Sequence, residues 1–257
     1  MSAPDGTAPV VLVTGAAGGI GSACVARFSA AGWRVVATDA NCAGLDALEA
    51  AGVVSRVAGD LRTAAGCRSI VRSALEATVG RLDALVNAAG VWREGPVADC
   101  TEDDYDVVMD VNAKGTVFMC AAAIPALQAT RGAIVNIASD AGRQGNLNAA
   151  VYCASKGAVV LFTKALALEL APHDVRANTV SPADVRTPML EFQATRYGGG
   201  DPEGYYRSLL AKYPQGERAR FIEPAEVAEP AFYLCSPAAA SITGGDFPID
   251  RGYSAGK

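Results

Sequence analysis

The stretch Val10-Val-Leu-Val-Thr-Gly-Ala-Ala-Gly-Gly-Ile-Gly21 decides the fold of this chain of 257 residues. It begins with a continuous apolar, β-branched run, which is typical of a strand buried on both faces of a parallel sheet. A helical pattern follows and stops at Gly32. The glycines between them allow a tight turn, and the backbone there can approach a pyrophosphate at the helix N-terminus. The stretch favours a dinucleotide-binding unit, although by itself it could also be a tight turn without a ligand.

The rest of the chain repeats this alternation of strand and helix. Further strands are predicted at about residues 34–38, 55–58, 82–86, 132–137, 175–180 and 247–250. Helices are predicted at about 45–50, 63–78, 101–129 with an irregularity near Gly115, and from Tyr152 to about 170. Strands that alternate with helices predict βαβ units and a parallel sheet. We expect a single Rossmann-type α/β domain over residues 1–257, with a doubly wound sheet of about seven strands.

The composition narrows the class of protein. Hydrophobic residues make up 51% of the chain and charged residues 19%, which argues against disorder. A net charge of −5 and the absence of a Lys/Arg cluster disfavour nucleic acid as a partner. The N-terminal sequence lacks the basic start of a signal peptide, and we expect no membrane-spanning helix. The expected location is the cytoplasm.

The seven cysteines predict neither a disulfide framework nor a zinc site. Their number is odd, and no pair has the C-x-x-C spacing of a metal or redox site. Most of them fall in apolar helical patterns and are expected to be small buried side chains. No metal is therefore expected in this protein.

Asp39 bears on the choice of cofactor. It lies 18 residues past Gly21, at the end of the second predicted strand. A carboxylate there can accept hydrogen bonds from both hydroxyls of the adenosine ribose and would repel a 2′-phosphate. Neither Gly18 nor Ala40 supplies a cation for such a phosphate. The sequence therefore predicts NAD rather than NADP, the alternative being a solvated aspartate at a strand end.

Tyr152 and Lys156 form a candidate acid/base pair. Four residues apart on a helix, they lie on the same face, and Ser139 follows the strand predicted just before that helix. A nearby ammonium would lower the pKa of a tyrosine from about 10 toward neutrality. The phenol could then exchange a proton with a substrate at working pH. Tyr-x-x-x-Lys also arises by chance, so the pair alone could be a contact on a helix surface.

Over nearly its whole length the chain resembles the short-chain dehydrogenase/reductase family. The motifs that carry the resemblance occur in family order and at family spacing: Thr14-Gly-x-x-x-Gly19-Ile-Gly21, Asn87-Ala-Ala-Gly90, Asn112, Ser139 and Tyr152-x-x-x-Lys156. The chain departs from the family pattern at Pro182-Ala183, where a glycine usually follows the proline. An alanine there could shift the loop that carries Val185 and Thr187.

The resemblance implies a role for each of four polar residues. Tyr152 would be the acid/base, and Lys156 would lower its pKa and hold the nicotinamide ribose. Ser139 would orient the substrate oxygen, and Asn112 would keep a water in a proton relay to Lys156. The resemblance also implies a homotetramer. Implied cofactor contacts are Gly15, Gly18, Gly19, Ile20, Gly21, Asp39, Asp60, Leu61, Asn87, Ala88, Ala89, Gly90, Tyr152, Lys156, Pro182, Val185 and Thr187.

The substrate pocket is expected between three loops. Its walls would be residues 91–93, 140–145 and 189–213, and the segment of about 183–222, which has no predicted strand, would be a substrate loop or lid. Arg93 or Arg143 could meet a carboxylate or phosphate, and Tyr197 would join a partly apolar lid. The candidate substrate contacts are Trp92, Arg143, Gln144, Met189 and Phe192.

These residues together predict an NAD-dependent oxidoreductase. It would interconvert a secondary alcohol and its ketone by hydride transfer, with cyclic or polyhydroxylated small molecules as candidate substrates. Because biosynthetic reduction usually uses NADPH, Asp39 favours the oxidative direction. A 3-oxoacyl-(acyl-carrier-protein) reductase is the alternative enzyme. A catalytically silent dinucleotide sensor or scaffold is the alternative of another class.

Overall fold

The computed structural model describes residues 8–50 and 52–255 and contains one parallel sheet with helices on both faces. The strands are β1 (Val10–Thr14), β2 (Arg34–Asp39), β3 (Val53–Ala58), β4 (Ala84–Asn87), β5 (Ala133–Ile137), β6 (Arg176–Pro182) and β7 (Asp246–Ile249). The helices are α1 (Gly19–Ala30), α2 (Cys42–Asp46), α3 (Ala64–Ala77), α4 (Glu102–Val108), α5 (Thr116–Thr130), α6 (Ala150–Leu170), α7 (Pro188–Tyr197), α8 (Pro202–Leu210) and α9 (Pro224–Cys235). The predicted single-domain, Rossmann-type parallel sheet is confirmed.

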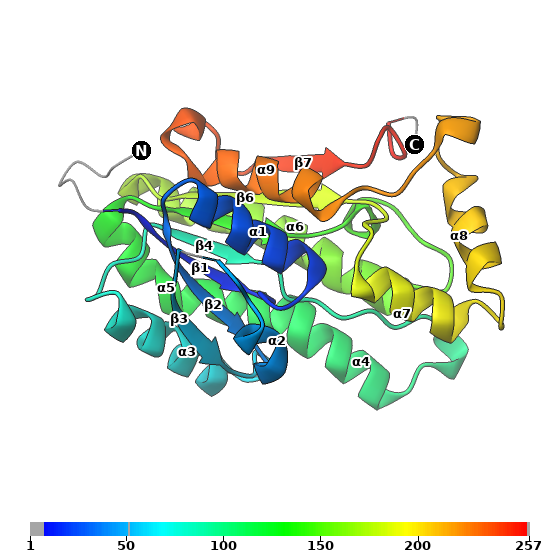
Figure 1. Ribbon diagram of the computed structural model, residues 1–257, viewed down its shortest axis with the longest axis horizontal. Helices are drawn as coiled ribbons and strands as arrows, with labels where there is room; N and C mark the ends of the chain where they lie inside the picture. The colour runs from blue at the N-terminus through cyan, green and yellow to red at the C-terminus, as the bar shows by residue number, and fades with distance from the viewer. Residues whose placement is uncertain (1–7, 51, 256–257) are drawn as a thin grey trace.

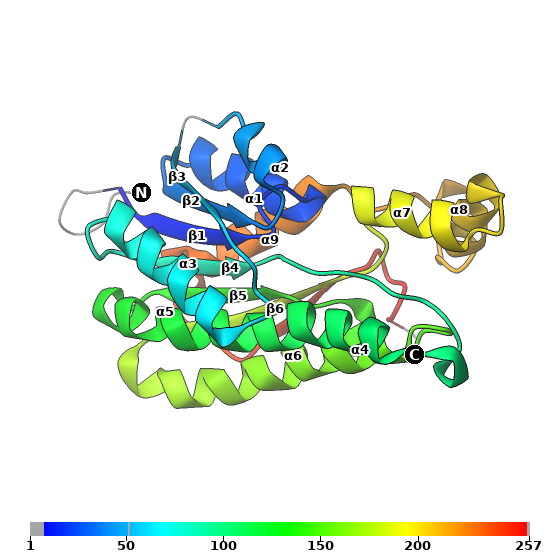
Figure 2. The same cartoon turned by 90° about the horizontal axis from the view of Figure 1, so that it is seen from below.

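Successive residues of β1 point to opposite faces of the sheet and so divide the core in two. Val11 and Val13 pack with the buried residues of α1 and α9, whereas Val10 and Leu12 pack with those of α3, α5 and α6. Figures 1 and 2 show these two helical layers on either side of the strands. All five residues of β1 are buried, which is why this strand has no polar alternation in its sequence.

The strand order places a ligand site beside β1. The order is β3-β2-β1-β4-β5-β6-β7, so the chain reverses its direction of winding between β1 and β4. In such sheets ligands bind beyond the carboxyl ends of the strands at this reversal. The segments after Thr14 and Asn87, which are paired residues on β1 and β4, meet there.

Two helical predictions need correction. The helix expected at about 45–50 is α2, which begins earlier because the Asn41 side chain accepts a hydrogen bond from Gly44 N (3.1 Å) and caps it. The single helix expected over 101–129 is α4 and α5 joined by a π-helical segment, Met109–Gly115. The irregularity predicted near Gly115 is therefore confirmed. π-Helical turns are frequent at functional sites, and Asn112 lies in this one.

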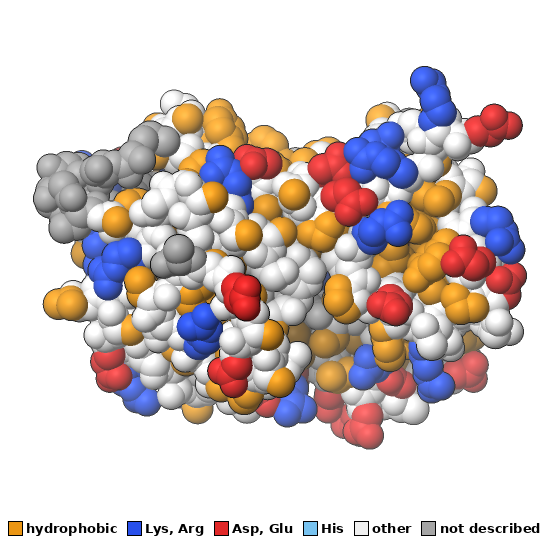
Figure 3. All heavy atoms as spheres, in the orientation of Figure 1, with side chains coloured by type: hydrophobic (Ala, Val, Ile, Leu, Met, Phe, Trp, Pro, Cys, Tyr) orange, Lys and Arg blue, Asp and Glu red, His pale blue; other side chains and the backbone are white. Residues whose placement is uncertain are grey.

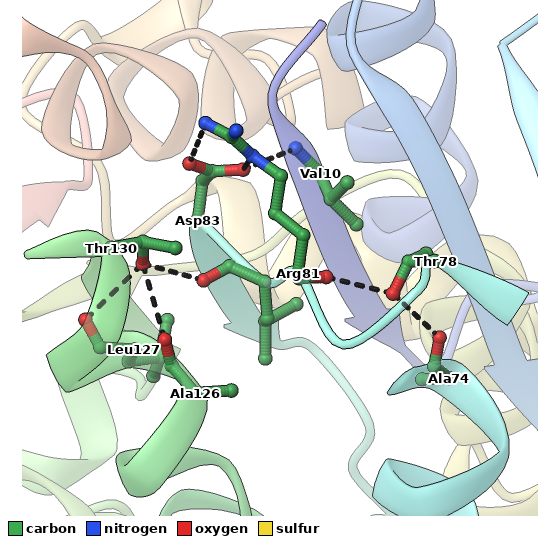
Figure 4. Close-up of polar contacts among 9 residues, drawn as sticks. Val10, Ala74, Thr78, Arg81, Asp83, Ala126, Leu127 and Thr130 are labelled. Carbon is green, nitrogen blue, oxygen red and sulfur yellow. Dashed lines mark hydrogen bonds and ion pairs between the residues drawn. The ribbon is translucent and has the colours of Figure 1, made fainter. Parts of the chain in front are cut away.

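A polar network holds the amino ends of the strands, opposite the ligand site (Figure 4). Asp83 Oδ2 accepts hydrogen bonds from Val10 N and Arg81 Nε, both at 2.8 Å. Thr130 Oγ1 at the end of α5 donates to Leu82 O (2.7 Å). These contacts join β1, β4 and α5 where their backbone groups would otherwise lack partners.

The long segment without predicted strands contains α7 and α8, which extend beyond the carboxyl edge of the sheet (Figure 1). A parallel bridge between Val185 and Ile222 closes its base. On the face seen in Figure 3, hydrophobic side chains gather over this end of the molecule. Acidic and basic side chains are interspersed elsewhere on that face.

Two helical spans are long and apolar enough to cross a membrane by length and composition: Glu102–Thr130 and Ala150–His173. Length and composition alone are weak evidence of a membrane span, because a helix buried in a protein core meets the same criterion. Both spans supply buried residues to the core, such as Leu127 and Leu166, so packing on the sheet accounts for their apolar character.

Candidate active site

Glycine is sterically required in the turn after β1. Gly15 has a φ of +64°, and a Cβ there would lie 2.6 Å from Ala89 Cα. A Cβ on Gly21 would overlap with the carbonyl oxygen of Gly15. Thr14 Oγ1 accepts hydrogen bonds from Ala88 N (3.1 Å) and Ala89 N (3.2 Å). The turn is thus held directly against the segment that follows β4.

A cavity of about 600 Å³ lies over this turn and fits a dinucleotide. It contains most of the predicted cofactor contacts: Gly15, Gly18, Gly19, Ile20, Gly21, Asp39, Asp60, Leu61, Ala88, Ala89, Gly90 and Thr187. Asn87 does not line it. Its side chain is buried and donates to Asn136 Oδ1 (2.8 Å), which ties β4 to β5, while its own Oδ1 has no partner.

The two carboxylates that line this cleft, Asp39 and Asp60, already accept hydrogen bonds from the chain. Asp39 accepts hydrogen bonds from Ala17 N (3.0 Å) and Asn41 N (2.9 Å), one on each oxygen, so each oxygen keeps a free acceptor position. Asp60 binds Arg62, and the hydrogen bond from this guanidinium lowers the pKa of Asp60. Among the described residues Arg62 is the one cationic side chain that lines the cleft, and the sequence analysis did not single it out.

Tyr152 and Lys156 are both buried on one face of α6. Lys156 Nζ donates a hydrogen bond to Ile137 O (2.9 Å) and lies 5.8 Å from the centre of the Tyr152 ring. Burial lowers the pKa of Lys156 to about 8. Trp92 packs against the tyrosine, with ring centres 4.3 Å apart. The phenol ring therefore has both an indole and an ammonium as neighbours.

The environment of Tyr152 opposes its ionisation. Burial raises the pKa of the phenol above its ordinary value, the charge of Asp140 raises it further, and a hydrogen bond with Ser139 lowers it. The expected lowering of this pKa by Lys156 is not what the arrangement produces. The ammonium donates to Ile137 O, and the charges of Asp140 and Asp184 act on the phenol to raise its pKa.

Asn112 fixes the loop that follows β4. Its Oδ1 accepts from Val91 N (2.8 Å), and its Nδ2 donates to Val91 O (3.0 Å) and to Ser155 Oγ (3.1 Å). A Cβ on Gly90 would lie 3.5 Å from both Asn112 Oδ1 and Lys156 Nζ, so these two groups flank the same glycine. The π-helical turn thus brings Asn112 beside the lysine.

A second cavity, of about 350 Å³, is the candidate substrate pocket. Of the predicted site residues it contains Trp92, Ser139, Tyr152, Lys156, Pro182, Val185 and Met189. It shares five lining residues with the cofactor cleft, so the two cavities are continuous: Ile20, Ala88, Gly90, Thr187 and Met189. Among the described residues, no cluster of His, Cys, Asp and Glu could hold a metal ion.

Three predicted substrate contacts lie outside this pocket. Arg143 pairs with Asp246 (Nε to Oδ2, 3.3 Å), and Gln144 turns inward and donates to Asp140 Oδ2 (3.1 Å). Phe192 is 44% exposed and packs edge-on against Tyr197. Arg93, the other candidate cation, pairs with Asp104 and also lies outside.

Three carboxylates that were not among the predicted substrate contacts line the pocket, although Asp140 begins the predicted wall of residues 140–145. Glu94, Asp140 and Asp184 each follow the carboxyl end of a strand, as the recognised residues do. Asp140 is adjacent to Ser139, and its Oδ1 accepts from Ser139 Oγ (2.8 Å). Their position beyond the strand ends was the signal that could have found them.

The arrangement can hold a dinucleotide across the glycine turn and a small substrate beside Tyr152. The Ser139 hydroxyl and the Tyr152 phenol both line the smaller cavity, which is continuous with the cofactor cleft, and this suits a proton transfer coupled to a redox step on the cofactor.

Comparisons with known proteins agree with this chemistry. A family described as enoyl-(acyl carrier protein) reductase matches residues 15–254. The D-threitol dehydrogenase of Mycolicibacterium smegmatis is 40% identical over 95% of this chain and 92% of its own. The 3-oxoacyl-(acyl-carrier-protein) reductase of Thermotoga maritima is 36% identical over 95% of this chain and 96% of its own.

Two solved structures have the same fold over almost all of the chain. A 3-ketoacyl-(acyl-carrier-protein) reductase from Brucella melitensis, in complex with NADH, has a TM-score of 0.84 and 31% identity, covering 96% of this chain and 98% of its own. An actinorhodin polyketide ketoreductase with NADPH has a TM-score of 0.88 and 34% identity, covering 98% and 99%. This chain therefore belongs to the short-chain dehydrogenase/reductase family, whose members are oxidoreductases that act on alcohols and ketones.

Proposed function

We propose that this protein is an NAD-dependent dehydrogenase that oxidises a small secondary alcohol to its ketone. The observation that carries the proposal is the meeting of two cavities at Gly90 and Met189, with Tyr152 in the lining of the smaller one. The bound nicotinamide would supply the redox chemistry by accepting a hydride. The chain itself has to position the substrate and move its proton.

The residues divide that work as follows. Tyr152 takes the proton of the substrate hydroxyl, and the Ser139 hydroxyl turns from Asp140 to donate to the substrate oxygen as charge develops there. Lys156 and Asn112, which both flank Gly90, carry the proton onward toward solvent. Val185 and Thr187 hold the carboxamide end of the cofactor, and residues 183–222 form the lid of the pocket.

A 3-oxoacyl-(acyl-carrier-protein) reductase is the second candidate, because a relative of that name is 36% identical over nearly the whole chain. The carboxylates of the pocket favour the first candidate. A substrate that presents several carbonyl oxygens offers them no donor.

Replacing Tyr152 tests whether the chain is an enzyme or a silent cofactor-binding protein. For Tyr152→Phe we expect the rate of alcohol oxidation, followed by NADH absorbance, to fall about 10²- to 10⁴-fold, which is the usual contribution of an acid/base group. Fluorescence titration should show that this variant still binds NADH. Tyr105→Phe, at a half-exposed tyrosine of α4, is the matched control and should keep full activity. Undiminished turnover by Tyr152→Phe would exclude the assigned mechanism.

Asp39 is proposed to select NAD. Two like charges about 4 Å apart repel strongly near a protein surface, so we expect NADH to bind at least about tenfold more tightly than NADPH. Asp39→Ser should lower the ratio of the NADPH dissociation constant to the NADH dissociation constant. Asp46→Ser, at an exposed aspartate of α2, should leave this ratio unchanged. Direct titration with both cofactors measures the ratio, and tighter binding of NADPH by the native chain would overturn the assignment.

Asp140 is proposed to set the working pH through Tyr152. The charged and titratable groups that act on this phenol are Asp140, Asp184, Cys153 and Lys156. Removing the negative charge of Asp140 favours the phenolate, so Asp140→Asn should shift the pH profile of kcat/KM for alcohol oxidation to lower pH by about one unit. Asp106→Asn, on the exposed side of α4, should leave the profile in place. A shift to higher pH would contradict this electrostatic role.

We further propose a homotetramer, because α5 and α6 leave an apolar face uncovered. Leu161 and Leu168 are 70% and 78% exposed on α6, and Phe118 on α5 is 36% exposed. Light scattering should give four times the mass of one chain. Leu161→Lys together with Leu168→Lys should lower that mass, whereas Val79→Lys, at a 93% exposed valine outside this face, should not. A monomeric native chain would exclude the assembly.

The cytoplasm is the proposed compartment. All seven cysteines are free thiols, and Cys24, Cys67, Cys120 and Cys235 are buried in the core. Such a set suits a reducing environment, where no disulfide is needed for stability. Fractionation of cells that make the protein would test this, and recovery outside the cytoplasm would contradict it.

A further inference from the structure

Three carboxylates surround the candidate substrate pocket and approach it from different strands. Glu94 lies on the loop after β4, Asp140 directly after β5 and Asp184 directly after β6. They act on one another across the cavity: burial raises the pKa of Asp184 to about 6, and the charge of Asp140 contributes to that rise. The pocket is therefore rich in hydrogen-bond acceptors.

The hydrogen bonds within the chain show which carboxylate oxygens are still open. Both oxygens of Asp140 are used, since Oδ1 accepts from Ser139 and Oδ2 from Gln144. Asp184 Oδ2 accepts from Tyr213 (3.1 Å), and Tyr213 is in turn held by Asp184 N (3.0 Å). Within the described residues no donor reaches Asp184 Oδ1. This oxygen is the acceptor that a substrate can fill.

Asp184 lines the same cavity as Tyr152 and is the open carboxylate whose charge acts on the reacting phenol. Its charge acts on the phenol of Tyr152, whereas Glu94 acts on Tyr205 of α8. Glu94 Oε2 accepts from Tyr205 (3.0 Å) and from Trp92 Nε1 (3.2 Å), which places it at the lid end of the pocket. A substrate whose carbinol carbon reacts at Tyr152 would present the carbon next to that carbinol to Asp184.

We propose that Asp184 accepts a hydrogen bond from a hydroxyl on the carbon next to the reacting carbinol, and thereby selects neutral vicinal diols and polyols. This inference rests on the proposed dehydrogenase function and adds the substrate class. A cavity of about 350 Å³ is at the small end of ligand pockets, which suits a short polyol.

Charge and hydrogen-bonding capacity disfavour the other substrate classes. Three carboxylates line the pocket against two ammonium groups, those of Lys156 and Lys212, so its net charge is negative and disfavours a substrate with its own carboxylate or phosphate. A cationic amino alcohol would face the ammonium of Lys156 on the side where the reaction occurs. A neighbouring carbonyl offers only acceptor oxygens, so it would leave Asp184 Oδ1 without a donor from the substrate. A hydroxyl neighbour satisfies all three constraints.

Two ketones that differ only at the neighbouring oxygen test this directly. With NADH, 3-hydroxybutan-2-one presents a hydroxyl next to the reacting carbonyl, and butane-2,3-dione presents a second carbonyl. Asp184→Asn replaces the open acceptor with an amide that can donate. We expect the ratio of kcat/KM for the hydroxyketone to that for the dione to fall about 10- to 100-fold, the effect of one hydrogen bond to a charged group. Because the ratio is compared between proteins, the intrinsic reactivity of each ketone cancels.

Controls and a second measurement separate the outcomes. Asp106→Asn should keep the native ratio, and NADH titration shows whether Asp184→Asn is folded. Independently of any variant, the native enzyme should oxidise butane-2,3-diol at least about tenfold more efficiently than butan-2-ol. An unchanged ratio in Asp184→Asn, or equal efficiency with the two alcohols, would overturn the role of Asp184 while the dehydrogenase function stands. Preference for 3-aminobutan-2-ol over the diol would also overturn it. A native enzyme that reduces neither ketone would instead refute the proposed function itself.

Discussion

The close approach of two backbone segments, at Gly15 and at Ala88–Ala89, is the constraint on which the rest of the site depends. Thr14 holds the second segment with two hydrogen bonds, and no side chain fits between the two turns. This contact joins β1 and β4 at the reversal of strand order. The two segments therefore line the cofactor cleft. The second one continues to Gly90, which lines both this cleft and the substrate pocket.

Burial and charge give the two titratable groups of α6 different tasks. Burial lowers the pKa of the Lys156 ammonium to about 8, which suits a group that passes a proton onward. For Tyr152, burial raises the pKa of the phenol, and the charges of Asp140 and Asp184 raise it further. The site as it stands thus favours a protonated tyrosine.

Sequence reasoning succeeded where a residue is constrained by its neighbours along the chain. The glycine turn, the buried run of β1 and the one-turn spacing of Tyr152 and Lys156 are local features, and each lies where it was predicted. It failed where partners come from distant segments. Arg143 was predicted to contact a substrate because it follows β5, but its guanidinium forms an ion pair with Asp246 of β7. Tyr213 occupies one carboxylate oxygen of Asp184 and leaves the other open. No local pattern in the sequence predicts this contact between residues 29 positions apart.

The central claim is that this site moves a hydride directly between substrate and nicotinamide while Tyr152 handles only a proton. Oxidation of butane-2,3-diol deuterated at its carbinol carbons, with mass analysis of the NADH formed, tests it most directly. The account predicts one carbon-bound deuterium in each NADH formed from the labelled diol in ordinary water. It predicts no carbon-bound deuterium in NADH formed from unlabelled diol in deuterium oxide, once the exchangeable N–H and O–H positions have been returned to hydrogen. Absence of carbon-bound deuterium in the first case, or its presence in the second, would contradict the account.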